Sequence, residues 1–187
     1  MAIGKHEPIQ SARTTLKGAV DALLDEALIA LEESFHDLTD RQIHGKPLAG
    51  RHNIATLVGH LLMSMDMYAA HLAAGKMTME HEPRFDIWTF SEEQLRDRQG
   101  NLPTKDELLR RLRTLRDAAL AYVKSAGETD LLSNRNLPDW YKARGRTQMD
   151  SILRLIGHVQ AHVRQVWLYR GAMGLKDADG WPQHHLA

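Results

Sequence analysis

The stretch that most constrains the fold of this chain is a long helical pattern between Thr147 and Gly174. Thr147 and Asp150 have the spacing of a capping box, in which two side chains bond each other's backbone amides at the start of a helix. Apolar residues then recur every three or four positions, which is the period of one face of an α-helix. The pattern predicts an amphipathic helix over residues 147–173, whose apolar face packs against other elements.

Three further stretches show the same period, over residues 10–38, 53–74 and 104–126. The second, over residues 53–74, ends before Gly75, and the third, over residues 104–126, opens with a capping box formed by Thr104 and Glu107. No segment alternates between apolar and polar residues as a strand should. The sequence therefore predicts an all-α protein. The first pattern, over residues 10–38, places these residues on one face: Leu16, Val20, Leu23, Ala27, Leu31, Phe35 and Leu38.

The connection between the second and third predicted helices, residues 76–103, is longer than most loops in compact domains. Ser91–Gln99 within it is predicted to form a short capped helix. A connection of this length can run back along a helix, so the second and third helices can lie parallel. We expect the 187 residues to form a single domain, 1–187, folded as a four-helix bundle with this long crossover.

Charge and cysteine content limit the classes of function. Lys and Arg together number 24, as do Asp and Glu, so a net charge of zero gives no electrostatic case for binding nucleic acid or an anionic membrane. No stretch approaches 18 apolar residues and the first ten residues lack an export signal, so we expect a cytoplasmic protein. Cysteine is absent. That excludes disulfides and a protein thiol nucleophile, and leaves His, Asp and Glu as the strong metal ligands.

Two histidines stand one turn apart on the last predicted helix. His158 and His162 lie at the edge of its apolar face, with rings about 5–6 Å apart, and could bind one divalent ion. A chain with 11 histidines can contain such a pair by chance, so the pair alone does not establish a site. His60 lies at the corresponding edge of the second predicted helix. His71 shares that side but lies three turns further along, about 16 Å away, and is predicted to belong to no common site.

The order and spacing of these motifs resemble the DinB/YfiT-like superfamily. Asn53-Ile-Ala-Thr-Leu-Val-Gly-His60 resembles the motif of its second helix, and Leu38-Thr-Asp-Arg-Gln with Pro47 fits the segment before it. Gly157-His158-Val-Gln-Ala-His162-Val-Arg-Gln165, followed by Tyr169-Arg170-Gly171, resembles the motif of its fourth helix. The chain departs from that pattern at Arg164, where the family often has glycine, and this bears on the wall of the site and on the substrate.

The resemblance implies an up-down-down-up bundle that is frequently a homodimer. It also implies that His60, His158 and His162 bind one divalent metal ion, with nickel or zinc expected. Several members of the family resemble transferases that use a low-molecular-weight thiol. Apolar side chains predicted on the outer faces of the helices, such as Leu62, Leu153 and Leu168, agree with a homodimer.

Three neutral imidazoles leave a divalent ion with at least one open position, which is the arrangement of a catalytic site. The leading hypothesis is a metal-dependent transferase that activates a low-molecular-weight thiol, its co-substrate, toward a small-molecule substrate. Two alternatives stay open: a hydrolase that activates water at the same histidines, and a non-catalytic dimeric helical bundle. The sequence identifies no catalytic residue beyond the three histidines. Candidates for a pocket wall are Trp140, Tyr141, Trp167 and Tyr169.

Overall fold

The computed structural model describes residues 15–46, 51–77 and 102–175, and these contain helices and no strand. The prediction of an all-α protein is confirmed. The long elements are α1 (Leu16–Phe35), α3 (Ile54–Met65), α6 (Lys105–Ser125) and α9 (Gln148–Ala172). The short ones are α2 (Asp40–His44), the π-helical turn η2 (Asp66–Ala70), α4 (His71–Ala74), α7 (Glu128–Leu131) and α8 (Asp139–Lys142).

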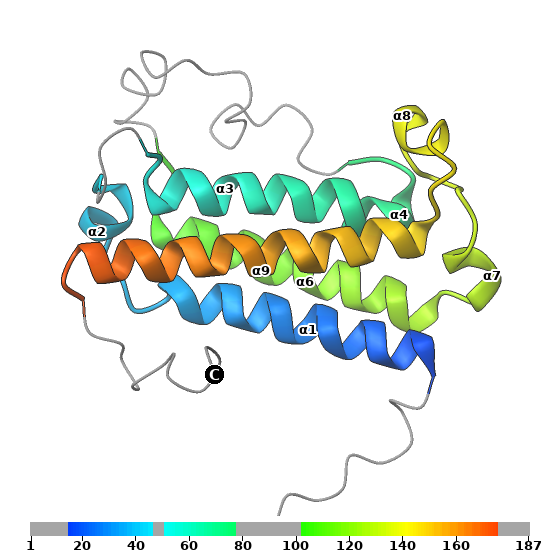
Figure 1. Cartoon of the computed structure of the whole chain (residues 1–187), viewed down its shortest axis with the longest axis horizontal. Coiled ribbons are helices and arrows are strands. Elements are labelled where there is room, and N and C mark those ends of the chain that lie inside the picture. Colours follow the sequence, from blue (N-terminus) through cyan, green and yellow to red (C-terminus); the bar gives the residue numbers. More distant parts are fainter. Residues whose placement is uncertain (1–14, 47–50, 78–101, 176–187) are drawn as a thin grey trace, which may run out of the picture.

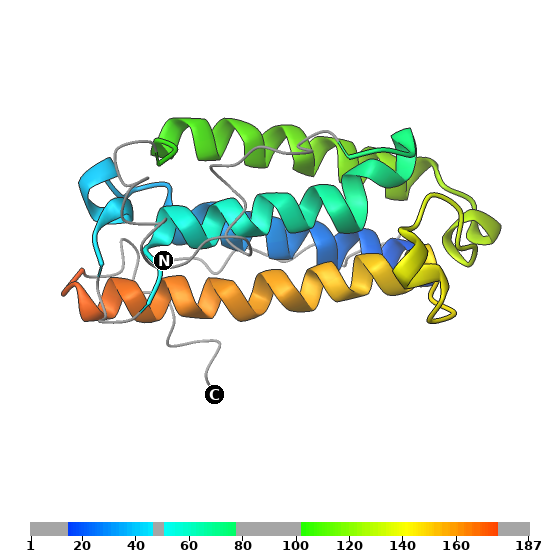
Figure 2. The same cartoon turned by 90° about the horizontal axis from the view of Figure 1, so that it is seen from above.

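The four long helices lie side by side in both views (Figures 1 and 2). α1 packs against α6 and α9, and α3 packs against the same two helices. The buried faces of all four share one hydrophobic core, to which each helix contributes fully buried side chains. Examples, one from each long helix, are Leu24, Leu61, Leu112 and Val159.

Side-chain caps set the starts of the long helices. Thr15, Asn53, Thr104 and Thr147 each accept a hydrogen bond from the backbone N–H three residues on, which satisfies an amide that the helix itself leaves unpaired. The predicted starts of α3, α6 and α9 agree with the structure to within two residues. The first helix ends earlier than predicted: α1 stops at Phe35, whereas the prediction extended to residue 38.

Four residues after that end, a capping box formed by Thr39 and Gln42 opens the short helix α2, which was not predicted as a helix. Residues 10–14 of the predicted first helix lie outside the described residues, as do Ser91–Gln99 and most of the predicted crossover.

The predicted faces were wrong at three leucines. Leu16 and Leu23 are 61% and 44% exposed, and the core face of α1 instead includes Leu24 and Leu28. α1 carries leucines around much of its circumference, so its contacts with α6 and α9 decide which of them are buried. Leu62 was predicted on an outer face but is fully buried.

Leu153 and Leu168 of α9 are 45% and 61% exposed, as expected of residues on an outer face. Within the described ranges, none of the helices combines the length and the apolar character needed to cross a membrane.

A buried arginine joins the end of α9 to the end of α1. Arg170 is 1% exposed, and its two terminal nitrogens donate to the two carboxylate oxygens of Asp37 at 2.6 and 2.8 Å. It also donates to the carbonyl oxygen of Ser34 and lies 4.7 Å from the centroid of a Trp167 ring. The hydrogen bond from Arg170 lowers the pKa of Asp37 below its usual value, so the pair stabilises the fold at neutral pH.

We predict that Asp37→Asn lowers the free energy of unfolding by about 1–3 kcal/mol at pH 7, because it leaves a buried guanidinium without its counter-charge. Asp25→Asn is the matched control. It breaks the more exposed pair with Arg116 and should cost about 1 kcal/mol or less. Urea unfolding of the two variants at pH 7 measures both values. Equal losses would show that the buried pair has no special role.

Candidate metal centre

The packing of α3 against α9 brings three histidine rings to one place. Nε2 of His158 lies 3.1 Å from Nε2 of His60 and 2.8 Å from Nε2 of His162. All three residues offer a ring nitrogen within 4.8 Å of the others. Tetrahedral coordination with metal–nitrogen bonds of 2.0–2.1 Å would place ligand nitrogens about 3.3–3.4 Å apart. The two separations from His158 are shorter than this by a few tenths of an ångström, so His158 and its two neighbours lie close to the spacing that one divalent ion requires.

A neighbouring side chain orients the ring of His162. Nδ1 of His162 faces the side-chain oxygen of Gln165, three residues along α9. An amide oxygen only accepts, so Nδ1 carries the proton and Nε2 presents its lone pair to the cluster. On α3, the hydroxyl of Ser64 donates to the backbone carbonyl of His60 at 3.0 Å. His60 is 4% exposed, whereas His158 and His162 are half-buried, so the cluster is open on the side of α9.

Burial keeps two of the imidazoles neutral at physiological pH. It lowers the pKa of His60 from 6.5 to about 4, with a smaller contribution from charge repulsion by His158 and His162. Burial likewise lowers the pKa of His158 to about 4, aided by the neighbouring His162. Because neutral imidazole is the form that binds a metal ion, protons compete with a metal at these two residues only in acid.

His71 and His44 form their hydrogen bonds elsewhere. His71, on α4, has Nδ1 2.8 Å from the carbonyl oxygen of Asp66 and Nε2 2.9 Å from that of Asn136. His44 bonds the carbonyl oxygen of Pro103. In the described ranges, the histidines that converge are the three predicted ones, and the prediction that His71 lies apart from them is confirmed.

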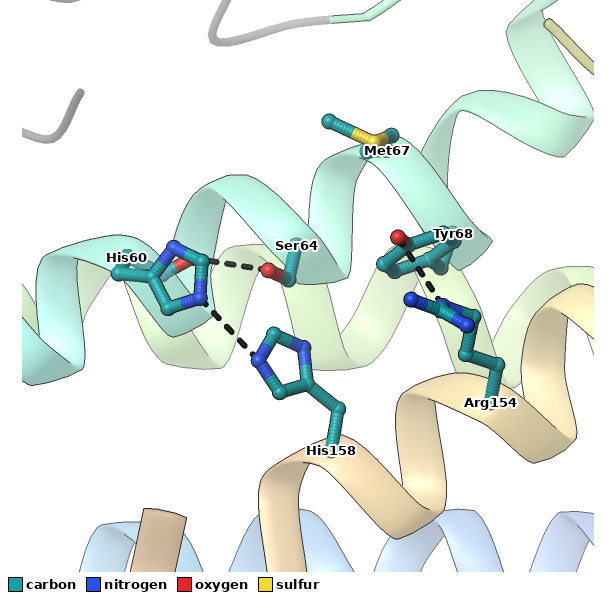
Figure 3. A pocket seen from close by; sticks show the side chains of 6 residues that line it. All are labelled: His60, Ser64, Met67, Tyr68, Arg154 and His158. Carbon is teal, nitrogen blue, oxygen red and sulfur yellow. Dashed lines mark hydrogen bonds between the residues drawn. The ribbon is translucent and has the colours of Figure 1, made fainter. Parts of the chain in front are cut away.

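A cavity of about 620 Å³ opens beside His60 and His158 (Figure 3). Its other walls come from positions at helical spacing from these two residues. Ser64 and Tyr68 follow His60 by four and eight residues, and Arg154 precedes His158 by four. Arg154 and Met67 were not predicted from the sequence, and Ser64 and Tyr68 were not assigned to a pocket. Most of them lie at whole helical turns from the two histidines, which is the signal that could have identified them. The four aromatic residues predicted as wall candidates do not line this cavity.

The π-helical turn η2 lies next to the cavity and contains Tyr68. The apolar pattern predicted one uninterrupted α-helix over residues 53–74, and this turn was not predicted. A π-helical turn is wider than an α-helical turn, so each residue in it advances by a smaller angle about the helix axis. Tyr68 is thereby kept closer to the side of the helix that carries His60 and Ser64. Such turns occur often at functional sites.

A family model described as the DinB superfamily matches residues 23–166, which include all three histidines and every residue that lines the cavity. The chain belongs to the DinB superfamily. The resemblance drawn from its sequence motifs is therefore confirmed at the level of the family.

A solved structure supports the same fold. The crystal structure of a conserved protein from Enterococcus faecalis superposes with a TM-score of 0.65 at 15% sequence identity, covering 86% of this chain and 99% of that one. At this level of identity the likeness concerns the fold alone. The search of curated proteins found no match to this chain.

We predict that the metal-free protein loses stability as the pH falls from about 6.5 to about 4. In the unfolded chain the histidines take up protons near pH 6.5, whereas His60 and His158 in the folded protein resist protonation down to about 4. Below pH 6.5 the unfolded state therefore binds more protons and gains in relative free energy. Urea unfolding with a chelator present, at pH 7.5 and pH 5, measures the loss.

The loss of stability between pH 7.5 and pH 5 should be smaller in His60→Gln, which removes one of the two histidines with a lowered pKa. It should be unchanged in His36→Gln, which replaces an exposed histidine outside the cluster. An equal loss in the wild type and in His60→Gln would contradict the assignment.

Proposed function

We propose that this protein is a divalent-metal-dependent transferase that joins a low-molecular-weight thiol to a small electrophilic substrate. The observation that carries the proposal is the convergence of three ring nitrogens, two of them on imidazoles whose pKa is lowered to about 4, at the edge of a cavity large enough for a small molecule. Imidazole ligands suit zinc and nickel, which are the metals we propose. When bound at such a site, a divalent cation lowers the pKa of a thiol that binds to it.

The chain's own residues have separate tasks in this proposal. His60, His158 and His162 hold the cation, and Gln165 orients the ring of His162. The cavity beside them holds the electrophile. The chain has no cysteine, so the attacking sulfur arrives with the co-substrate. In the transfer, a bond forms between that sulfur and an electrophilic carbon, the leaving group departs with the bonding electron pair, and the thiol proton passes to solvent.

The proposal includes the up-down-down-up order of the long helices. Figure 1 supports it: by the colour bar, α1 and α9 end on the side of the bundle where α2 lies, and α3 and α6 begin on that side. With this order, α3 and α9 run in opposite directions, so residues that follow His60 face residues that precede His158. A cytoplasmic location is part of the same proposal, because thiols are kept reduced there.

We also propose a homodimer, supported by the exposed apolar side chains of Leu153 and Leu168 on α9. Sedimentation equilibrium at tens of micromolar should give twice the chain mass of 21.2 kDa, and a monomer mass would contradict the dimer.

Metal analysis and a thiol-dependent assay test the proposal together. Protein purified without added metal should contain about one nickel or zinc ion per chain, as three imidazoles at one centre predict. It should also accelerate the reaction of cysteine with 1-chloro-2,4-dinitrobenzene, a generic electrophile. His158→Gln should lose the metal and the rate acceleration while remaining helical, because the apolar faces supply most of the stability. His36→Gln is the control and should retain both properties.

The two measurements separate the alternatives. A protein that binds metal but shows no thiol-dependent turnover would not be a thiol transferase, and hydrolysis would then be the activity to test. A protein that binds no divalent metal would contradict the proposal as a whole.

A further inference from the structure

The end of the cavity that faces away from the histidines carries a positive charge. Arg154 lies there against Tyr68, with Ser64 between this pair and the histidines (Figure 3). Nε of Arg154 donates to the Tyr68 hydroxyl oxygen at 3.2 Å, and the guanidinium carbon lies 5.5 Å from the centroid of the Tyr68 ring. These two contacts hold the plane of the guanidinium group in one orientation.

Part of the Arg154 guanidinium group makes no hydrogen bond to the described protein. Within residues 15–46, 51–77 and 102–175, Nη1 and Nη2 of Arg154 have no hydrogen-bond partner, and no carboxylate forms an ion pair with the group. Arg146, which precedes α9, is engaged differently, because it lies 3.8 Å from a carboxylate oxygen of Asp150. The hydroxyl of Tyr68 accepts from Nε, so its own proton remains available to donate. The three donors form a cluster suited to an oxyanion.

We propose that Arg154 and Tyr68 form a binding subsite for a carboxylate group carried by one of the two reactants. A planar guanidinium fork binds a carboxylate through two parallel hydrogen bonds. Arg154 supplies one positive charge, which balances the single charge of a carboxylate, whereas a phosphate would bring close to two. The described residues that line the cavity include no second lysine or arginine.

The position of the subsite sets the size of its ligand. Arg154 and His158 are four residues apart on α9, which corresponds to a rise of about 6 Å along the helix axis. A ligand whose carboxylate binds Arg154 and whose reacting atom lies beside the histidines is therefore a short-chain acid. Met67 contributes an apolar side chain to the lining of the cavity, and Ser64 contributes a hydroxyl group. The subsite would make the protein selective for small acids over neutral analogues.

The role of the subsite in catalysis rests on the proposed transferase function, but binding of a carboxylate does not require the metal. The first experiment therefore uses the metal-free full-length protein. Propionate and the isosteric neutral propionamide are titrated while the side-chain Nε–H signal of Arg154 is followed by NMR. We expect propionate to bind about ten-fold more tightly than propionamide, as charge-assisted hydrogen bonds predict.

Variants define the subsite. Arg154→Gln should abolish the preference for propionate, read from the backbone amide signals of Ser64 and Tyr68. Arg154→Lys should retain part of it, because the charge remains and the fork is lost. The control is Arg110→Gln, which removes an exposed arginine of α6 outside the cavity and should leave the preference unchanged. Equal binding of propionate and propionamide by the wild type, or an undiminished preference in Arg154→Gln, would overturn the subsite.

A second experiment with the metal-loaded protein identifies which reactant carries the carboxylate. One arm compares 3-mercaptopropionate with 2-mercaptoethanol as the thiol. The other arm compares bromoacetate with bromoacetamide as the electrophile, where the thiol sulfur bonds to the methylene carbon and bromide leaves with the bonding pair. In the arm that contains the natural source of the charge, Arg154→Gln should raise KM about ten-fold for the acid and leave KM for its neutral analogue unchanged.

An increase in KM for the acid in either arm supports the proposal and assigns the source, and no increase in both arms overturns its catalytic role. If the protein binds no metal, the transferase function fails, while the propionate titration still decides whether the subsite exists.

Discussion

The contact between α3 and α9 is the interaction on which the candidate centre depends. α9 by itself supplies two histidines one turn apart, a pair that many helices carry by chance. The third imidazole comes from a helix nearly one hundred residues earlier in the sequence, and it reaches the pair because apolar residues beside it are buried between the helices. Leu61 follows His60 and Val159 follows His158, and both are fully buried. Burial of such a side chain contributes about 1.5–3 kcal/mol, so the core holds the rings together.

α9 is fixed at both ends, which makes it a rigid support for the site. At its start the capping box of Thr147 and Asp150 closes the first turn, and the backbone amide of Gln148 donates to the carbonyl oxygen of Ser133. At its end Arg170 ties the helix to α1 through Asp37. His158 and His162 lie between these two anchors. Sites built on helices that are held in this way keep their geometry better than sites on loops.

Much of this arrangement could be predicted from the sequence because it follows from local patterns. The caps at Thr104 and Thr147 are short-range signals, and the edge position of His60 follows from the helical period. What could not be predicted depends on tertiary contacts. The burial of Leu62 depends on what packs around α3, and the low pKa of His60 results from its exclusion from water. The π-helical turn at Tyr68 leaves no signal in the apolar pattern. The sequence does not distinguish Arg154 from other exposed arginines, and only the structure shows that it lines the cavity.

X-ray absorption at the metal edge tests the central claim most directly, because it measures the ligands around the ion rather than its consequences. Zinc added in equimolar amount to the wild-type protein should show about three imidazole nitrogen neighbours at 2.0–2.1 Å, and His60→Gln should show one fewer. This result would establish that α3 and α9 together build the centre. A spectrum of fully hydrated zinc, or one that is identical in the wild type and in His60→Gln, would contradict the account.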